Sequence, residues 1–329
     1  MSARPRLATV VPLLVLALLV AGLVWGLATA AAGESPTPTL SGASVSPGAG
    51  KVVLKVGWSP DIDNFNPFVG INQTSYELYH VSYDFLTDYG DQYLETRPGL
   101  AESWTHSADG LTWTFKVRQG VKWSDGQPLT ARDIAFTYNW EIKLQLQAFL
   151  AALDGIKSAS APDDATLVIT CSRPKADILS MWCPILPEHV WSQFKTEDAA
   201  KKYLNSPPIV GSGPFQVVAW KKGVYVRCVA NKEYWGGTPK ADELLFEQYT
   251  NQDTLAQDLK LGTIDLAINL PPAQIKPLAA TSGLAAYGCS QKQFDYLSFN
   301  CYAGPSLGNP VLRDPKFRQA LNWASTRSR

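Results

Sequence analysis

The feature that most constrains the fold of this chain is an alternating strand pattern close to its middle. The segment "LTWTFKVRQGVKWSDG", residues 111–126, places Trp113, Phe115 and Val117 on one face and polar residues on the other. The chain then turns toward Val121 and Trp123. Alternation on both sides of a turn that contains glycine predicts a β-hairpin with one buried face.

A helix start follows this pattern within a few residues. Thr130 and Asp133 have the spacing of a capping box, with Asp in place of the usual Glu, and predict a helix that continues through Leu150. Hydrophobic periodicity elsewhere predicts strands and helices that interleave without regular repeats, so the fold class is mixed α/β (α+β). The further predicted strands are 52–56, 166–170, 215–220, 225–230, 244–246, 264–268 and 296–299, and the further helices are 76–86, 253–261 and one that begins at Pro315.

The N-terminal segment predicts export. Arg4 and Arg6 precede an uncharged apolar run that ends in the small residues "LATAAAG". Residues 1–32 are therefore expected to be a signal peptide, with cleavage favoured, or an N-terminal membrane anchor, because the run is long enough to span a bilayer. Residues 33–50 are rich in Pro, Ser, Gly and Thr and are expected to form a flexible linker. The expected location is periplasmic or at the cell surface.

The charge balance and the cysteines exclude some classes of function. Lys plus Arg and Asp plus Glu both number 29, so there is no basic field to bind nucleic acid. The cysteines number five and show no C-x-x-C spacing, so a zinc site is not expected. Cys171 with Cys183, or Cys289 with Cys301, could form disulfides in an exported protein, and buried free thiols are the alternative.

The sequence contains no motif for nucleotide binding or for the common hydrolytic sites. It has no G-x-G-x-x-G loop, no phosphate-binding lysine loop, no G-x-S-x-G elbow and no H-E-x-x-H helix. We therefore expect no catalytic residue, no metal site and no cofactor. A pair of acids could serve a glycoside hydrolase, but turn formation and solvation explain the candidates better. The acids are Asp61, Asp63 and Glu102, and the histidines, which are expected to be structural, are His80, His106 and His189.

Four stretches, taken in order, resemble the family-5 extracellular solute-binding proteins of bacterial ABC importers, which bind peptides, oligopeptides or nickel. The stretches are "LAESWTHSADGLTWTFKVRQGVKWSDGQPLTARDIAFTYN", "GSGPFQVVAWKKGVYVRCVANKEYWGG", "LKLGTIDLAI" and "VLRDPKFRQALNWA". The resemblance implies a periplasmic-binding-protein-like lobe, residues 51–300, whose mixed sheet is discontinuous. Residues 51–75 and 206–300 would form the main sheet, and residues 76–205 an inserted hairpin subdomain.

The resemblance also implies a second lobe, of which residues 301–329 would be the truncated start. In this family the ligand is held between two lobes that close by a hinge, so one lobe alone is expected to bind weakly or not at all. The C-terminal helix would then expose an apolar stripe that a complete second lobe would cover. The stripe consists of Phe317, Ala320, Leu321 and Ala324.

The function implied by the resemblance is capture of peptides for delivery to a membrane permease, by a monomer that is not an enzyme. An oligosaccharide or metal-complex binder, a secreted glycan hydrolase and a nonfunctional fragment are the alternatives. The residues that match the family's cleft and hinge are expected to contact the ligand: Asn72, Gln73, Thr74, Ile268, Asn269, Leu270, Tyr296 and Asn300.

Overall fold

The structure of the protein is a computed structural model that describes residues 50–59, 61–70, 72–90, 95–287, 298–305 and 308–324. The chain divides into two compact units, residues 1–290 and 291–329. The signal or anchor segment, residues 1–32, lies outside the described residues, as does the expected linker apart from Gly50.

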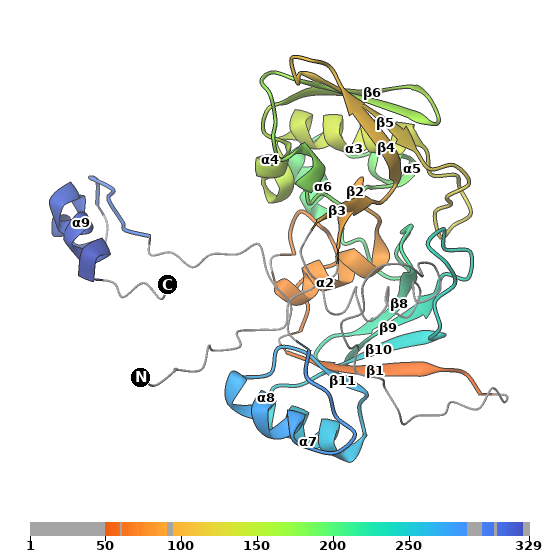
Figure 1. Ribbon diagram of the computed structural model, residues 1–329, viewed down its shortest axis with the longest axis vertical. Helices are drawn as coiled ribbons and strands as arrows, with labels where there is room; N and C mark the ends of the chain where they lie inside the picture. Colours follow the sequence, from red (N-terminus) through yellow and green to blue (C-terminus); the bar gives the residue numbers. More distant parts are fainter. Residues whose placement is uncertain are drawn as a thin grey trace, which may run out of the picture. The chain divides into compact units, whose positions relative to one another are not determined.

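A five-stranded mixed sheet is the centre of the first unit, and its strands come from distant parts of the chain (Figure 1). The strand order is β11-β1-β10-β9-β8. β1 runs parallel to both β10 and β11, whereas β9 is antiparallel to β10 and to β8. The predicted discontinuous sheet is therefore present. Its strands are β1 (Val53–Trp58), β8 (Phe215–Lys221), β9 (Tyr225–Ala230), β10 (Glu243–Gln248) and β11 (Leu266–Ala267).

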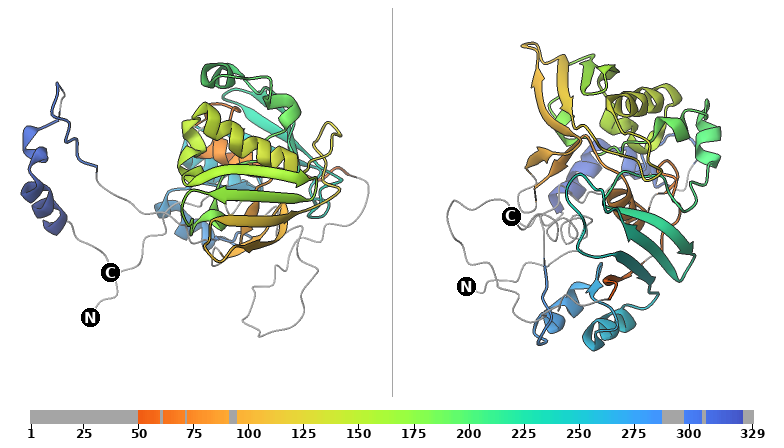
Figure 2. Two further views of the ribbon diagram at one scale, coloured as in Figure 1. Left: turned by 90° about the horizontal axis from the view of Figure 1, so that it is seen from above. Right: turned by 90° about the vertical axis from the view of Figure 1, so that its right-hand side faces the viewer.

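A second, antiparallel sheet with the order β4-β5-β7-β6 is formed by the middle of the chain. The helix α3 (Ala131–Leu144) lies along one face of this sheet (Figure 2). Two short strands, β2 and β3, pair with each other. The strands are β2 (Thr87–Tyr89), β3 (Thr96–Pro98), β4 (Ala101–His106), β5 (Thr112–Val117), β6 (Ile156–Asp163) and β7 (Thr166–Cys171).

The capping box predicted for α3 is confirmed, but the helix is shorter than predicted. The Thr130 side chain accepts a hydrogen bond from the backbone of the first turn, and the backbone N–H of Thr130 donates to Asp133 over 2.9 Å. The helix ends at Leu144 because Gln145 adopts the left-handed conformation, with φ of 55°. A separate helix, α4 (Gln147–Leu153), then begins.

The hairpin predicted around residues 111–126 is wrong in its pairing. β5 pairs with β4 on one side and β7 on the other, and residues 121–123 form no strand. Val121 and Trp123 are buried, but their backbone bonds to Leu129 and Gln127, which folds this segment back toward α3. An alternating apolar pattern indicates which side chains are buried, but it does not show whether they lie on a paired strand or on another segment that enters the core.

Two glycines join the two sheets at the end of the helix α2 (Gln73–Ser82). The backbone N–H of Gly213 donates to the carbonyl oxygen of Ser82 over 3.0 Å. A Cβ atom on Gly211 would lie 2.0 Å from that same oxygen, and one on Gly213 would lie 2.5 Å from the carbonyl oxygen of Val81. Only glycine allows the backbones to approach this closely. The "GSGPF" segment therefore returns the chain to the five-stranded sheet as predicted.

Aromatic side chains fill the core that the sheets and helices share. Trp191 is fully buried, and its ring contacts those of Phe68, Trp140 and Tyr203 at centroid distances of 5.5, 5.8 and 5.1 Å. The remaining helices cover the sheets or connect them: η1 (Ile178–Ser180), α5 (Glu188–Trp191), α6 (Glu197–Lys202), α7 (Gln252–Leu261) and α8 (Pro272–Ala279). The end of α7 at Gly262, which has φ of 71°, agrees with the sequence prediction.

The described cysteines are free thiols. Cys171 and Cys183 are buried and unpaired, so the first disulfide candidate is wrong. Burial in apolar surroundings is the ordinary state of a free cysteine. Cys301 is also free, and Cys289 lies outside the described residues.

The described part of the second unit contains η2 (Pro310–Arg313) and α9 (Pro315–Ala324). Asp314 Oδ1 accepts a hydrogen bond from the backbone N–H of Lys316 over 2.8 Å, and α9 starts at Pro315 as predicted. No residue of α9 is buried. Ser298 and Phe299 belong to no strand, and the rest of the strand predicted at 296–299 lies outside the described residues.

Candidate functional site

The candidate site lies where the three parallel strands end. β11, β1 and β10 have the same direction, so their carboxyl ends share one edge of the sheet. The helix α2 follows β1 after a loop, and the residues after β11 lead into α8. In open sheets with parallel strands, ligands bind at this edge, because loops rather than paired backbone lie there.

Asn72, Gln73 and Thr74 form the start of α2. Asn72 is the N-cap residue, with extended backbone, and Gln73 and Thr74 belong to the first turn. The side chains of Asn72 and Thr74 both donate to the carbonyl oxygen of Asp61 over 3.2 Å. Thr74 is fully buried, whereas Asn72 and Gln73 are half-buried. The first two residues are thus open to contact from outside the core.

Ile268, Asn269 and Leu270 follow β11 directly. The backbone N–H of Ile268 donates to the carbonyl oxygen of Gly57 over 3.1 Å, which extends the contact between β11 and β1. Ile268 and Leu270 are buried in hydrophobic clusters, 2% and 7% exposed. Asn269 lies between them with φ of 60°, a left-handed conformation that asparagine adopts more readily than most residues. The turn is therefore anchored by two apolar residues and presents one amide.

A buried carboxyl group connects these two segments. Glu77 lies on α2 and is 1% exposed. Its Oε1 accepts a hydrogen bond from Gln73 Nε2 over 3.3 Å, and the Asn269 side chain also donates to the carboxyl group. Burial raises the pKa of Glu77 to about 8, and the two amide donors oppose that rise. The structure thus brings the expected residues Gln73 and Asn269 together through Glu77.

Two polar atoms at the ends of β1 and β10 are buried without a hydrogen-bond partner among the described residues. Trp58 ends β1 and Gln248 ends β10, and the two residues are register partners. Trp58 Nε1 and Gln248 Oε1 both lack a partner within the described part of the chain. A buried polar atom left unpaired costs about 1–3 kcal/mol, so such atoms call for water, a ligand or another segment.

Two expected ligand contacts belong to the second unit. Tyr296 lies outside the described residues. Asn300 is exposed, and its Oδ1 accepts a hydrogen bond from the backbone N–H of Tyr302 over 3.1 Å. The expectation that these residues contact the ligand stays a prediction.

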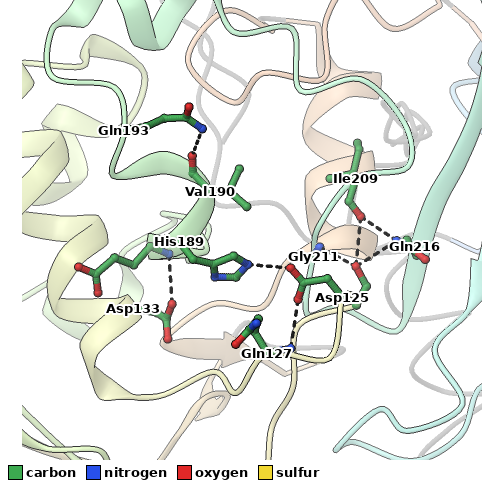
Figure 3. Close-up of polar contacts among 11 residues, drawn as sticks. Asp125, Gln127, Asp133, His189, Val190, Gln193, Ile209, Gly211 and Gln216 are labelled. Carbon is green, nitrogen blue, oxygen red and sulfur yellow. Dashed lines mark hydrogen bonds and ion pairs between the residues drawn. The ribbon is translucent and has the colours of Figure 1, made fainter.

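The three histidines lie in three different settings. His189 Nε2 and Asp125 Oδ2 are 2.7 Å apart, a contact that ties α5 to the turn before α3 (Figure 3). His80 is half-buried, accepts a hydrogen bond from Trp182 Nε1 and has a pKa lowered by desolvation. His106 is exposed, with Nδ1 2.9 Å from the carbonyl oxygen of Ser107. Within the described ranges, no group of three His, Cys, Asp or Glu side chains could hold a metal ion.

The acids considered for glycoside hydrolysis all have hydrogen-bond or ion-pair partners within the protein. Asp61 accepts hydrogen bonds from the backbone of Ile62 and of Gly223. Asp63 accepts one from the Ser75 hydroxyl over 2.7 Å, so this acid shapes the start of α2. Glu102 lies on β4, where it pairs with Lys116 at 3.0 Å and Arg118 at 3.6 Å.

Sequence reasoning missed Glu77, Trp58 and Gln248. A signal for Glu77 was present, because it is the one acid between the apolar residues Tyr76 and Leu78 of a helix predicted to pack on the sheet. Trp58 and Gln248 have no comparable signal. Their importance depends on which strands end at the same edge, and pairing over such a distance cannot be seen in the pattern of either strand.

The comparisons with known proteins identify the class. The oligopeptide-binding protein AppA of Bacillus subtilis is 26% identical over 83% of this chain and 50% of its own length. Its structure in complex with a nonapeptide matches 65% of this chain and 44% of that chain, with a TM-score of 0.59. NikZ of Campylobacter jejuni, in complex with Ni(L-His), matches 84% of this chain and 54% of that chain at 24% identity, with a TM-score of 0.66. These relatives are binding proteins, and the chain shares their periplasmic-binding-protein-like fold.

The family model for the middle part of the bacterial extracellular solute-binding proteins, family 5, matches residues 95–329. The chain belongs to this family. It spans about half the length of the curated relatives it matches. Among the described residues, no helix is both long enough and apolar enough to cross a membrane.

Proposed function

We propose that this chain is the extracytoplasmic substrate-binding component of an ABC importer and that it captures peptides for delivery to a membrane permease. The observation that carries the proposal is the carboxyl edge of the parallel strands, in a chain whose family binds extracellular solutes. Residues 1–32 would direct the chain out of the cytoplasm, to the periplasm or the cell surface. The chain would act as a monomer.

The chemistry of this edge suits a peptide. Trp58 Nε1 is a donor and Gln248 Oε1 is an acceptor, and neither has a partner among the described residues. A peptide main chain presents N–H and C=O groups in alternation, so it can satisfy both kinds of atom along one extended segment. The half-buried side chains of Asn72 and Gln73 would add polar contacts beside it, with Thr74, Ile268 and Leu270 supporting them from the core.

Nuclear magnetic resonance on the full chain tests this proposal. The probe is a mixed library of short peptides, and the readout is the indole N–H signal of Trp58, which the Trp58→Phe variant assigns. We expect peptides to shift this signal in a saturable way and to leave the signal of Trp191 unchanged. Trp191 is the matched control, because its Nε1 is also buried without a described partner but it lies on α5 rather than at the end of a parallel strand.

Two outcomes of this experiment would contradict the proposal. Peptides that saturate the protein without moving the Trp58 signal would place the site elsewhere. A response to Ni(L-His) or to oligosaccharides, with none to peptides, would assign the chain to another branch of the family's ligands.

A further inference from the structure

Glu77 and Asn269 form a pair whose polar atoms do not match if the carboxyl group is ionised. The Asn269 amide donates to the Glu77 carboxyl group, and Gln73 Nε2 donates to its Oε1. Glu77 Oε2 and Asn269 Oδ1 are both buried and both lack a described partner. An ionised carboxylate oxygen and an amide oxygen are both acceptors, so neither can satisfy the other in the protein interior.

One proton on Glu77 removes this mismatch. A protonated carboxyl group has one O–H donor and keeps an acceptor oxygen, and a primary amide likewise offers one donor and one acceptor. The O–H on Oε2 can donate to Asn269 Oδ1 while the amide donates to the other carboxyl oxygen. Both atoms that lack partners are then satisfied by the same pair.

We propose that Glu77 is a positioning residue of the ligand site, which acts as a neutral acid and pairs reciprocally with the Asn269 amide. This pair holds the turn at 268–270 against the start of α2, the two segments that supply most of the expected ligand contacts. The inference rests on the proposed function, since it names what orders that same site.

Within the described part of the chain, no charged group contributes to the pKa of Glu77. Its pKa is set by burial and by the neutral amides of Gln73 and Asn269. Of the acids in the preceding loop, Asp63 accepts hydrogen bonds from donors at the start of α2, and Asp61 accepts them from the backbone of Ile62 and of Gly223. The nearest elements therefore offer Glu77 hydrogen bonds but no ion pair, which is the environment of a carboxylic acid that is neutral at pH 7.

The pair is tested without ligand by following the Glu77 carboxyl carbon by nuclear magnetic resonance in the full chain. We expect a titration with a midpoint near 8, absent in Glu77→Gln, and we expect the Asn269 side-chain amide signal to change with the same midpoint. Titration near the ordinary range of glutamate would overturn the proposal, and so would an Asn269 signal that does not follow Glu77. Glu102→Gln, on the exposed side of β4, is the matched control and should leave both titrations unchanged.

Rescue by glutamine separates positioning from simple packing. A glutamine amide can make the same reciprocal pair with Asn269 and cannot ionise, whereas Glu77→Ala loses it. Peptide affinity in the wild type should fall about tenfold between pH 7 and pH 9, as the paired population falls. In Glu77→Gln it should stay constant. A pH-dependent pair in a chain that binds no peptide would reject the proposed function alone, and peptide binding with the same pH profile in both proteins would reject the pair alone.

Discussion

Two glutamates, one on α2 and one on α3, are similarly buried but have different neighbours. Burial raises the pKa of both Glu77 and Glu141 to about 8, and both have an Oε2 without a described partner. Glu141 lies on α3 in the inserted region, where it accepts a hydrogen bond from the Cys183 thiol over 3.4 Å. Glu77 faces an amide at the carboxyl edge of the parallel strands.

The difference shows why burial alone does not mark a functional group. A thiol is a weak donor, and the residues around Glu141 belong to the aromatic core, so this acid is enclosed by packing. The amide of Asn269 belongs to a turn next to half-buried polar residues at the end of three strands. We therefore assign Glu141 to stability and Glu77 to the site, and the predictions below test that contrast.

The largest expected effect is in the core of the inserted region. Trp191→Ala should lower the free energy of unfolding by about 3–5 kcal/mol, because it removes a fully buried ring with several aromatic neighbours. Urea unfolding measures this loss. Trp323→Ala, at a side chain that is 80% exposed, is the control and should change little. A loss below about 1 kcal/mol in Trp191→Ala would mean that the core repacks easily.

The junction between the two regions should be the next most sensitive position. Gly211→Ala should cost about 1–3 kcal/mol, because the new Cβ would lie 2.0 Å from the carbonyl oxygen of Ser82. Thermal and urea unfolding measure the change. Gly50→Ala is the matched control, since nothing lies within 4 Å of a Cβ at that position. Equal stability of the two variants would contradict the close approach.

The two buried glutamates should make the protein less stable as pH rises. Their pKa values of about 8 lie above the ordinary value, so between about pH 4.5 and 8 the folded state holds protons that the unfolded state has lost. Stability is therefore lost as pH rises through this window. Asp84 adds to the trend, because burial raises its pKa to about 7.

Glutamine variants separate these contributions. Glu141→Gln and Glu77→Gln should each reduce the slope of stability against pH by up to about 1.4 kcal/mol per pH unit, measured by urea unfolding at pH 5, 6, 7 and 8. Only Glu77→Gln should also alter the pH dependence of peptide binding. An unchanged slope in either variant would show that the carboxyl group it replaced is ionised in the folded protein.

The smallest expected effect comes from helix caps, one in each region. Thr130→Ala at the start of α3 and Asn251→Ala at the start of α7 should each cost about 1 kcal/mol, since each removes a side-chain acceptor for the first turn. Thermal unfolding measures both. Ser206→Ala, at an exposed residue outside the helices and strands, is the control and should change little. A cost at Thr130 alone would show that the end of the main-sheet region frays independently.

Local signals in the sequence predicted much of the fold. The capping box at Thr130, the strands predicted at 215–220 and 225–230 and the helix predicted at 253–261 each depend on a few adjacent residues, and all are present. The pairing of β5 failed because Val121 and Trp123 are apolar for burial in the core, not for a strand. Periodicity reports which side chains are buried, but not what covers them.

The candidate site was predicted less completely than the fold. The resemblance led to Gln73 and Asn269, and the structure brings these two residues together. It also led to Ile268 and Leu270, which are buried. Glu77 was missed because its role depends on a contact between segments almost 200 positions apart, which neither segment reveals alone.

The placement of β1 has a consequence for how the chain acquires its structure. Lys51, just before β1, forms an ion pair with Glu243 at the start of β10, 192 positions later. At typical rates of synthesis, β1 waits roughly 10–40 s for its parallel neighbour. The four-stranded sheet needs only residues 101–171 and can form during that interval. The inserted region is then the first to become ordered, and the edge that holds Glu77 and Asn269 is completed last.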